Sequence, residues 1–356
     1  MTSRLRVTIA TAMKAPHNRY FTPHAWLLLG LTLVLAGCGQ QPDLVVYCSL
    51  DQEFAEPLIQ RFEKETGLAV HAEFDVEAAK TVGLVARIRE ESKNPRCDVF
   101  WNNEVAHTVG LGNDGLLESY DSPSAKEIPA GFRDPGGHWT GFAARARILI
   151  VNTTLIDPKE IHSMWDLVDP KWNGKSVIAK PLTGTTLTHM AALYSVIGEE
   201  KAGEYLARIH ELSKTGGVNI TNGNASVARL VGDGKIAFGW TDTDDFAVAK
   251  ERGAPVVAVY PDADGCGTLL LPNAIAILKG APHLAAAKRF EDWVLRPEIE
   301  KELAFSRSAQ IPVRDSVPRP DGMLSGKQFK VMAVDFQKLG SELEKRAEVF
   351  KKLFLD

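Results

Sequence analysis

Three short polar segments contain most of the residues in this sequence that could bind a ligand. The first segment is Asp242-Thr243-Asp244-Asp245, which follows a short apolar run that ends at Thr241. The second is Thr183-Gly184-Thr185-Thr186, which precedes a helical pattern, and the third is Asn222-Gly223-Asn224, which lies between two predicted elements. Carboxylates bind hard cations or ammonium groups, whereas hydroxyls and N–H groups at a helix start bind anions. These segments therefore predict a site that meets positive charge on one side and negative charge on the other.

Each segment also has a purely structural interpretation. Thr is a good N-cap, Asn-Gly forms turns readily, and Asp at a helix start interacts favourably with the macrodipole. Three Thr and a Gly at 183–186 exceed what a cap needs, and Asp244 and Asp245 follow a predicted strand. We therefore favour ligand binding for these two segments, while both interpretations stay open for the Asn-Gly-Asn segment and for Asp242.

Basic side chains are expected near the same site. Arg145 and Arg147 are two residues apart, so on a regular strand they share one face and both can reach an anion. The alternative is a pair of surface or interdomain charges. Lys80 lies in a predicted strand-to-helix loop, where it either contacts a ligand or stays solvated.

No catalytic set accompanies these residues. The sequence contains neither a G-x-S-x-G motif nor a P-loop, and its His residues show no i, i+4 spacing typical of a zinc site. We therefore predict a binding protein that is not an enzyme and has no resident cofactor.

The elements expected to position the site alternate between strands and helices. Apolar β-rich runs at 44–47 and 98–101 and an alternating run at 68–74 are separated by helical patterns, which predicts a parallel sheet with helices on both faces. Ligands of such sheets lie beyond the carboxyl ends of the strands. This places Ser49, Asp51, Asn103 and Glu104 among the expected ligand-binding residues.

Two long apolar strands, near Arg147–Asn152 and Thr268–Leu278, bracket a second α/β segment. We therefore expect two lobes, with residues 44–142 and 276–356 in the first and 143–275 in the second. Two strand connections form a hinge, and a hinge beside a cleft allows closure around a ligand.

The N-terminus has the composition of a targeting segment. Residues 1–38 contain four Lys or Arg and no acidic residue, followed by an apolar run that ends in Leu35-Ala36-Gly37-Cys38. This ending resembles the lipobox of bacterial lipoproteins. We therefore predict a lipoprotein signal peptide over 1–38, lipidation of Cys38, a tether over 39–43, and a lipid-anchored protein at the extracytoplasmic face of the cell envelope.

Charge and cysteine content narrow the possible partners. Loss of residues 1–38 leaves 37 Lys and Arg against 45 Asp and Glu, so the formal charge moves from −4 to −8 and nucleic acid is an unfavourable partner. Cys48, Cys97 and Cys266 remain, and they form either one disulfide with a free thiol or three small buried residues.

One segment resembles a stretch of the family 1 extracellular solute-binding proteins of ABC importers. It begins with Ser163-Met164-Trp165-Asp166-Leu167 and ends with Pro170-Lys171-Trp172-Asn173-Gly174-Lys175. Asp98-Val99-Phe100-Trp101, Arg145-Ala146-Arg147 and Ala309–Arg314 are also similar to that family. The resemblance implies a two-lobe type II periplasmic-binding-protein fold with a two-strand hinge, a monomeric state, and an ABC-type permease as partner.

The most similar branch is that of the ferric-iron-binding periplasmic proteins. By position, the resemblance implies metal ligands at Asp51, at Asn103 or Glu104, and at Asp244 and Asp245, with an anion at 183–186 opposite Asn222 and Asn224. That branch has a Tyr pair where this sequence has Asp244-Asp245. Carboxylates bind a hard cation or hold an amine, so two cargo hypotheses follow, which are a metal with an anion and a zwitterion or organic anion such as an aminophosphonate.

Other classes of function remain as alternatives. A binding protein with the same two lobes can serve a receptor as a sensor, and an enzyme can be built on the same fold, because fold does not determine function.

Overall fold

The computed structural model describes residues 41–75 and 81–355, and Pro42–Asp356 forms one compact unit. The first elements along the chain are β1 (Leu44–Cys48), α1 (Gln52–Thr66), β2 (Val70–Phe74), α2 (Val82–Glu90), β3 (Val99–Asn102), α3 (Ala106–Asn113) and β4 (Thr140–Asn152). Then follow β5 (Ser176–Ala179), α4 (Gly184–Val196), α5 (Glu199–Thr215), β6 (Val218–Thr221), α6 (Asn224–Gly232), β7 (Phe238–Asp242), α7 (Thr243–Glu251), β8 (Val256–Val259) and β9 (Leu270–Ile277). The last helices are α8 (Leu284–Val294), α9 (Pro297–Phe305) and α10 (Phe336–Leu355).

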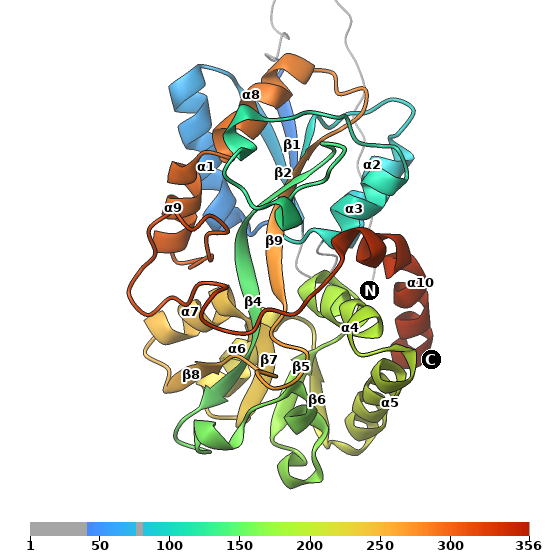
Figure 1. Cartoon of the computed structure of the whole chain (residues 1–356), viewed down its shortest axis with the longest axis vertical. Coiled ribbons are helices and arrows are strands. Elements are labelled where there is room, and N and C mark those ends of the chain that lie inside the picture. The colour runs from blue at the N-terminus through green and yellow to red at the C-terminus, as the bar shows by residue number, and fades with distance from the viewer. Residues whose placement is uncertain (1–40, 76–80, 356) are drawn as a thin grey trace, which may run out of the picture. The chain divides into compact units, whose positions relative to one another are not determined.

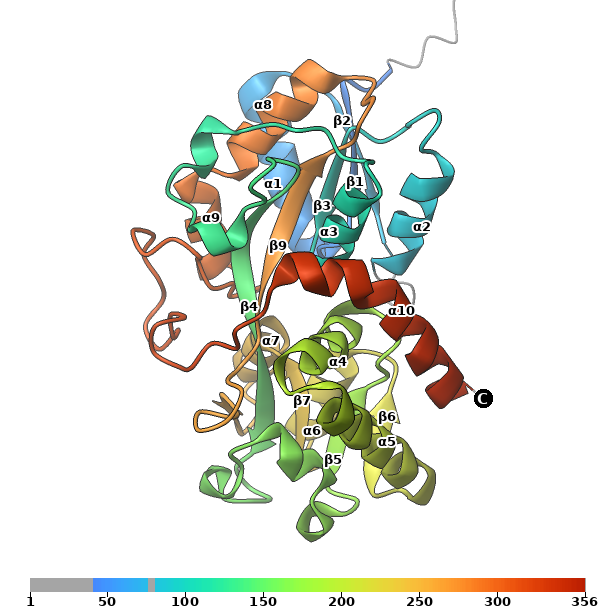
Figure 2. The same cartoon turned by 45° about the vertical axis from the view of Figure 1, so that its right-hand side comes forward.

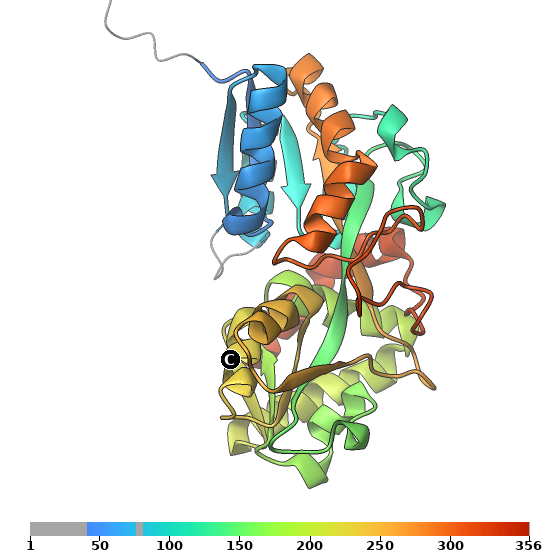
Figure 3. The same cartoon turned by 90° about the vertical axis from the view of Figure 1, so that its left-hand side faces the viewer.

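The strands form one mixed sheet in the order β2-β1-β3-β9-β4-β7-β5-β6, with β8 paired to β4 (Figure 1). β1 pairs in parallel with β2 and β3, and β5 pairs in parallel with β6 and β7. These two parallel sets are connected through β4, whose residues Thr140–Ala146 pair with β9 and whose residues from Arg147 onward pair with β7 and β8. Figure 3 shows β4 running from one set to the other. Both predicted long strands are therefore formed.

A bulge bends β4 near its start. The register with β9 shifts between Phe142 and Ala144, and Ala143 has a φ of 43°, which is uncommon for a residue with a Cβ. The Ala143 N–H donates to Glu300 Oε1 at 2.8 Å, and Glu300 Oε2 pairs with the buried Arg314 at 2.7 Å. The Ala309–Arg314 segment therefore helps to hold the bend of β4.

Separate apolar clusters pack against the two parts of the sheet. One contains Phe62, whose ring centroid lies 4.9 Å from that of Phe290 and 5.6 Å from that of Trp293, both edge-on. Another contains Trp172 and Phe238, whose centroids are 5.6 Å apart. The Trp172 contact therefore gives the Pro170–Lys175 part of the sequence a packing role in this second core.

The C-terminal helix α10 packs against both parts of the chain. It contacts α3 on one side and α4 and α5 on the other (Figure 2). A Cβ at Gly340 would lie 2.5 Å from Val109 Cγ1 and 2.9 Å from the Ala106 carbonyl oxygen, so only Gly allows this approach to α3. α10, which is expected in the first lobe, therefore also contacts helices that lie within residues 143–275.

No disulfide is formed among the described residues, and burial raises the pKa of the Cys97 thiol well above its usual value. The predicted signal peptide and Cys38 lie outside the described residues. No helix in the described part of the chain is long and apolar enough to cross a membrane.

We predict that Gly340→Ala lowers stability by about 1–3 kcal/mol, because the added methyl group is forced against α3. Thermal unfolding measures this as a lower Tm, by roughly 2–4 °C per kcal/mol. The matched control is Gly203→Ala in α5, where a Cβ meets nothing within 4 Å. A Tm for Gly340→Ala equal to that of the control would contradict the tight packing of α10 on α3.

Candidate functional site

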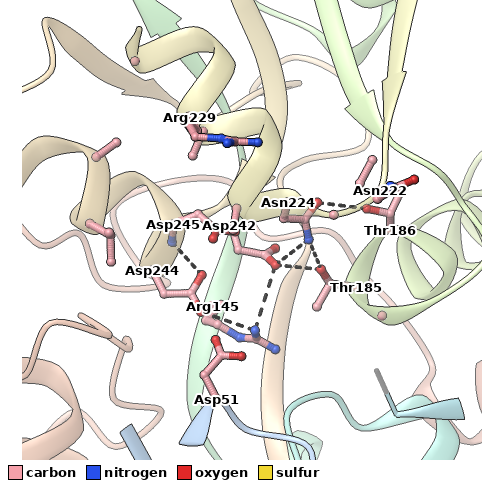
Figure 4. A pocket seen from close by; sticks show the side chains of 18 of the residues that line it. Asp51, Arg145, Thr185, Thr186, Asn222, Asn224, Arg229, Asp242, Asp244 and Asp245 are labelled. Carbon is pink, nitrogen blue, oxygen red and sulfur yellow. Dashed lines mark hydrogen bonds and ion pairs between the residues drawn. The ribbon is translucent and has the colours of Figure 1, made fainter. Parts of the chain in front are cut away.

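A cavity of about 550 Å³ lies where the carboxyl ends of the strands meet β4. Most of the residues expected to bind ligand line it, namely Asp51, Asn103, Arg145, Thr183, Gly184, Thr185, Thr186, Asn222, Asn224, Asp242, Asp244 and Asp245. They come from the loop after β1, the loop after β3, the strand β4, and the starts of α4, α6 and α7. Figure 4 shows labelled lining side chains from these elements gathered around the cavity, although the elements are far apart in sequence.

The cavity floor is organised by a buried ion pair. Arg147 is fully buried in β4, and its Nη1 donates to Asp242 Oδ1 at 2.9 Å across the β4–β7 pairing. Asp242 Oδ2 accepts from Thr185 Oγ1 at 2.6 Å and from Asn224 Nδ2 at 3.0 Å. Both oxygens of Asp242 are therefore already engaged by protein groups. Arg147 lines no part of the cavity and acts from behind it.

The charge state of Asp242 follows from these contacts. Burial alone would raise the pKa of Asp242, but Arg147, Arg145 and the hydrogen bond from Thr185 hold this pKa below its ordinary value. The carboxylate is thus ionised at neutral pH and fixes the position of Thr185 and Asn224.

Arg145 occupies the centre of the site. Its Nη1 lies 3.3 Å from Asp244 Oδ2 and 3.9 Å from Asp242 Oδ2, while its Nη2 donates to the Asn103 carbonyl oxygen. Burial would lower the pKa of Arg145, but the carboxylates of Asp244, Asp242 and Asp51 raise it above its ordinary value. Arg145 is therefore a permanent cation that joins the loop after β3 to the start of α7.

Two helices begin at the cavity without a side-chain cap. Thr183 precedes α4 and Gly223 precedes α6, and neither side chain caps its helix. The polar side chains of the first turns bond to each other instead, with Asn224 Nδ2 donating to Thr185 Oγ1 at 2.8 Å and Thr186 Oγ1 donating to Asn224 Oδ1 at 3.1 Å (Figure 4). The cap interpretation of 183–186 is therefore wrong, and the partial positive charge of both helix starts faces the cavity.

The three carboxylates at the start of α7 lie close together. One oxygen each from Asp242, Asp244 and Asp245 fall within 4.8 Å of one another. Thr241 Oγ1 donates to Asp245 Oδ2 at 3.0 Å, and the Asp245 N–H donates to Asp244 Oδ1 at 2.9 Å. Thr241 does not line the cavity and orients Asp245 from the strand.

Glu104 has a different role from the metal ligand that the resemblance implies. It is fully buried, and its carboxylate accepts from the N–H groups of Ala106 and His107 at 2.8 and 3.0 Å, from Asn102 Nδ2 at 3.0 Å and from Thr188 Oγ1 at 2.9 Å. Glu104 therefore caps α3 internally and does not line the cavity. Ser49 is likewise buried away from the lining, and Lys80 lies outside the described residues.

Several lining residues were not predicted. On α6 and at the end of α7 the cavity is lined by Arg229 and Arg252, with Lys180 after β5 and Glu53 and Phe54 at the start of α1. Arg229 lies five residues after Asn224, on the helix face that also carries Ala225, Ala228 and Gly232. Helical periodicity counted from Ala225 is the sequence signal for this position, because residues three or four apart lie near one another on a helix.

The acidic and basic lining residues differ in their partners. Asp242 and Asp244 pair with arginines, Glu53 pairs with Arg307 at 2.8 Å, and Asp233 pairs with Lys235 at 3.6 Å. In contrast, Lys180, Arg229 and Arg252 make no side-chain hydrogen bond or ion pair with any residue of 41–75 or 81–355. The unsatisfied charge of the described lining is therefore positive.

Solved structures with this architecture bind small solutes. The periplasmic binding protein AfuA from Actinobacillus pleuropneumoniae, with fructose-6-phosphate bound, is 26% identical and superposes with a TM-score of 0.75 over 88% of this chain and 98% of its own. The ferric binding protein from Campylobacter jejuni, 23% identical, reaches a TM-score of 0.77 over 87% of this chain and 99% of its own. The predicted α/β fold of the type II periplasmic binding proteins is thus confirmed.

The sequence comparisons identify the family. The profile of the bacterial extracellular solute-binding proteins matches residues 57–330, and the chain belongs to this family. Similar members include iron uptake protein A1 of Synechocystis sp., 25% identical over 87% of this chain and 90% of that protein. The major ferric iron-binding protein of Neisseria meningitidis is 24% identical over 77% and 82%. The resemblance read from the sequence is confirmed.

We predict that Asp242→Asn destabilises the protein by about 3–5 kcal/mol at neutral pH, because it leaves Arg147 buried without its counter-ion. The low pKa of Asp242 in the folded state adds stability above the unfolded pKa of about 3.9, and this contribution is lost as pH falls through the folded pKa. Urea unfolding at several pH values should therefore show the gap between wild type and variant narrowing below about pH 4.

The control is Asp233→Asn, whose carboxylate is half exposed and pairs with an exposed lysine. It should change stability by less than about 1 kcal/mol. Equal losses for the two variants, or a gap for Asp242→Asn that does not depend on pH, would show that the Arg147–Asp242 pair does not organise the cavity floor.

Proposed function

We propose that this protein is the solute-binding component of an ABC importer and that its cargo is a small organic anion with a phosphate, phosphonate or carboxylate head group. A similar protein of Sinorhizobium fredii, 26% identical over 65% of this chain and 64% of that protein, is described as a probable ABC transporter periplasmic-binding protein. Within this proposal the protein acts in transport and not as an enzyme, which agrees with its membership of the solute-binding family.

One observation carries the choice of an anion. In the cavity, Asp242, Asp244 and Glu53 form ion pairs with arginines. In contrast, Lys180, Arg229 and Arg252 have no hydrogen-bond or ion-pair partner for their side chains among the described residues. Two uncapped helix starts add partial positive charge on the same wall. An anion is the ligand that satisfies these groups without displacing an existing ion pair.

The inner end of the cavity suits the anionic head group. The first turns of α4 and α6, at Thr185, Thr186 and Asn224, offer backbone N–H groups to the head group, while the side chains of these residues are engaged with one another and with Asp242. Asn222 lies beside them (Figure 4). Asp51 lies on the opposite side, below Arg145 in the same view, and Asn103 also lines the cavity. They suit an amine or hydroxyl group of the ligand body, which agrees with the zwitterion hypothesis.

A ferric ion is the second candidate, and the names of similar iron-binding proteins together with the cluster of Asp242, Asp244 and Asp245 favour it. Three observations weigh against it. Both oxygens of Asp242 are engaged, Glu104 caps α3, and no Tyr lines the cavity in the described part of the chain. A metal would also have to compete with Arg145 for Asp244.

We predict that Asn222→Asp weakens anion binding by about tenfold or more, because it adds a like charge at the head-group position. Asn222 is exposed and its side chain makes no hydrogen bond with any described residue, so the fold should tolerate the change. Titration calorimetry with inorganic phosphate, fructose 6-phosphate and aminoethylphosphonate, on protein freed of metal with a chelator, measures the effect.

The control is Asn94→Asp, an identical charge change at an exposed position away from the cavity. It should leave binding unchanged. The metal hypothesis replaces the anion hypothesis if none of the three compounds binds to chelated protein, while ferric salts with bicarbonate raise the Tm and Asn222→Asp preserves that rise.

We also propose that residues 44–142 with 276–356 and residues 143–275 move as two lobes about β4 and β9 when ligand binds. Arg307 supports this proposal, because it pairs with Glu53 of α1 at 2.8 Å and with Glu251 of α7 at 2.7 Å. These exposed pairs contribute little energy, so they can form and break during closure. The contacts of α10 with α3 on one side and with α4 and α5 on the other would limit the extent of this closure.

For the cell-envelope location we infer that Cys38 is lipidated and residues 1–37 are removed. The mass of the protein extracted from host membranes should equal that of residues 38–356 plus acyl groups, and Cys38→Ser should abolish both the added mass and stable membrane attachment. A soluble mature form with a different start, unaffected by Cys38→Ser, would disprove this inference.

A further inference from the structure

The cavity extends well beyond the head-group position. It continues along one face of α6, formed by Ala225, Ala228, Arg229 and Gly232, and along the facing residues of α7. The α7 side consists of Asp245, Val248, Ala249 and Arg252, spaced as one helical face. The extension is thus a groove between two helices with small residues along its walls and one arginine on each side.

The far end of the groove is closed by a close approach between its two walls. A Cβ at Gly232 would lie 3.2 Å from the Ala254 side chain and 3.9 Å from the Ala249 side chain. Arg229 lies one turn before this closure on α6, and Arg252 immediately follows α7. Both arginines therefore belong to the closed end and not to the head-group position at Asn224.

Within the described part of the chain, neither Arg229 nor Arg252 has a structural role that would account for its position in the cavity lining. The buried Arg145 and Arg147 hold the site together through Asp242 and Asp244. Arg229 and Arg252, in contrast, are exposed and have no ion pair or side-chain hydrogen bond with any described residue, although both line the cavity. Nearby Asp233 pairs with Lys235 at 3.6 Å. In Figure 4, Arg229 lies on the opposite side of the aspartates from Asp51.

We propose that Arg229 and Arg252 form a second anion subsite and that the cargo carries two acidic groups joined by a short body. This inference rests on the proposed function, because it takes the first acidic group to bind at Thr185, Thr186 and Asn224. Five residues separate Asn224 from Arg229 on α6, which corresponds to about 7 Å along the helix axis. The second acidic group therefore lies about that far from the first, and the Ala side chains of the groove contact the body between them.

The test compares alkyl monophosphonates with diphosphonates of the same chain length, from methane through propane and pentane to heptane. Titration calorimetry on the chelated, purified protein gives the affinity gain that each second phosphonate provides. We expect no gain for the methane compound, because it is too short to reach the arginines. For the pentane compound we expect a gain of about tenfold or more, which falls as salt increases.

Arg229→Gln combined with Arg252→Gln should remove this gain, and it should lower the affinity for monophosphonates by much less, because a single head group binds at the two helix starts. Arg208→Gln is the matched control, because Arg208 is an exposed arginine on α5 that does not line the cavity. If monophosphonates bind and the second phosphonate adds nothing at any length, or if the gain survives in the double variant, the second subsite is wrong and the proposed function stands. If no phosphonate binds, the proposed function and the subsite fail together.

Discussion

The pairing of Arg147 with Asp242 is the interaction on which the site depends. Two full charges lie in the interior, on adjacent strands, and burying either one alone would cost several kcal/mol. Their pairing permits a polar cavity floor in the middle of a mixed sheet. The same carboxylate also receives Thr185 and Asn224, so it fixes the starts of α4 and α6 relative to β4 and β7.

The fixed floor determines which groups remain available to a ligand. Because the side chains at the two helix starts bond to one another and to Asp242, they do not cap their own helices, and the helix starts keep their partial positive charge. Arg145 neutralises Asp244 in the same way. Asp244, a predicted metal ligand, thus acts as an internal counter-ion, and the available charge of the lining belongs to Lys180, Arg229 and Arg252.

Membership of the family limits the possible cargo of this protein less than the residues that line its cavity do. Proteins of similar fold are described as binding ferric iron in one case and as holding fructose-6-phosphate in another. A shared fold provides strand ends and helix starts around a cleft, which can hold either kind of cargo. The side chains at those positions, and their engagement by neighbours, determine which cargo fits.

The sequence alone was sufficient for the fold class, the two long strands and the polar lining residues at strand ends and helix starts, because hydrophobic periodicity and strand-end position are local properties. The tertiary structure decided which predicted residues reach the cavity. Glu104 and Arg147 have the side-chain chemistry and the position along the chain that ligand binding requires. In the folded protein, however, Glu104 accepts hydrogen bonds from N–H groups of α3, and Arg147 pairs with Asp242. Whether a charged group is free or already paired depends on neighbours that are distant in sequence, and only the folded chain brings those neighbours together.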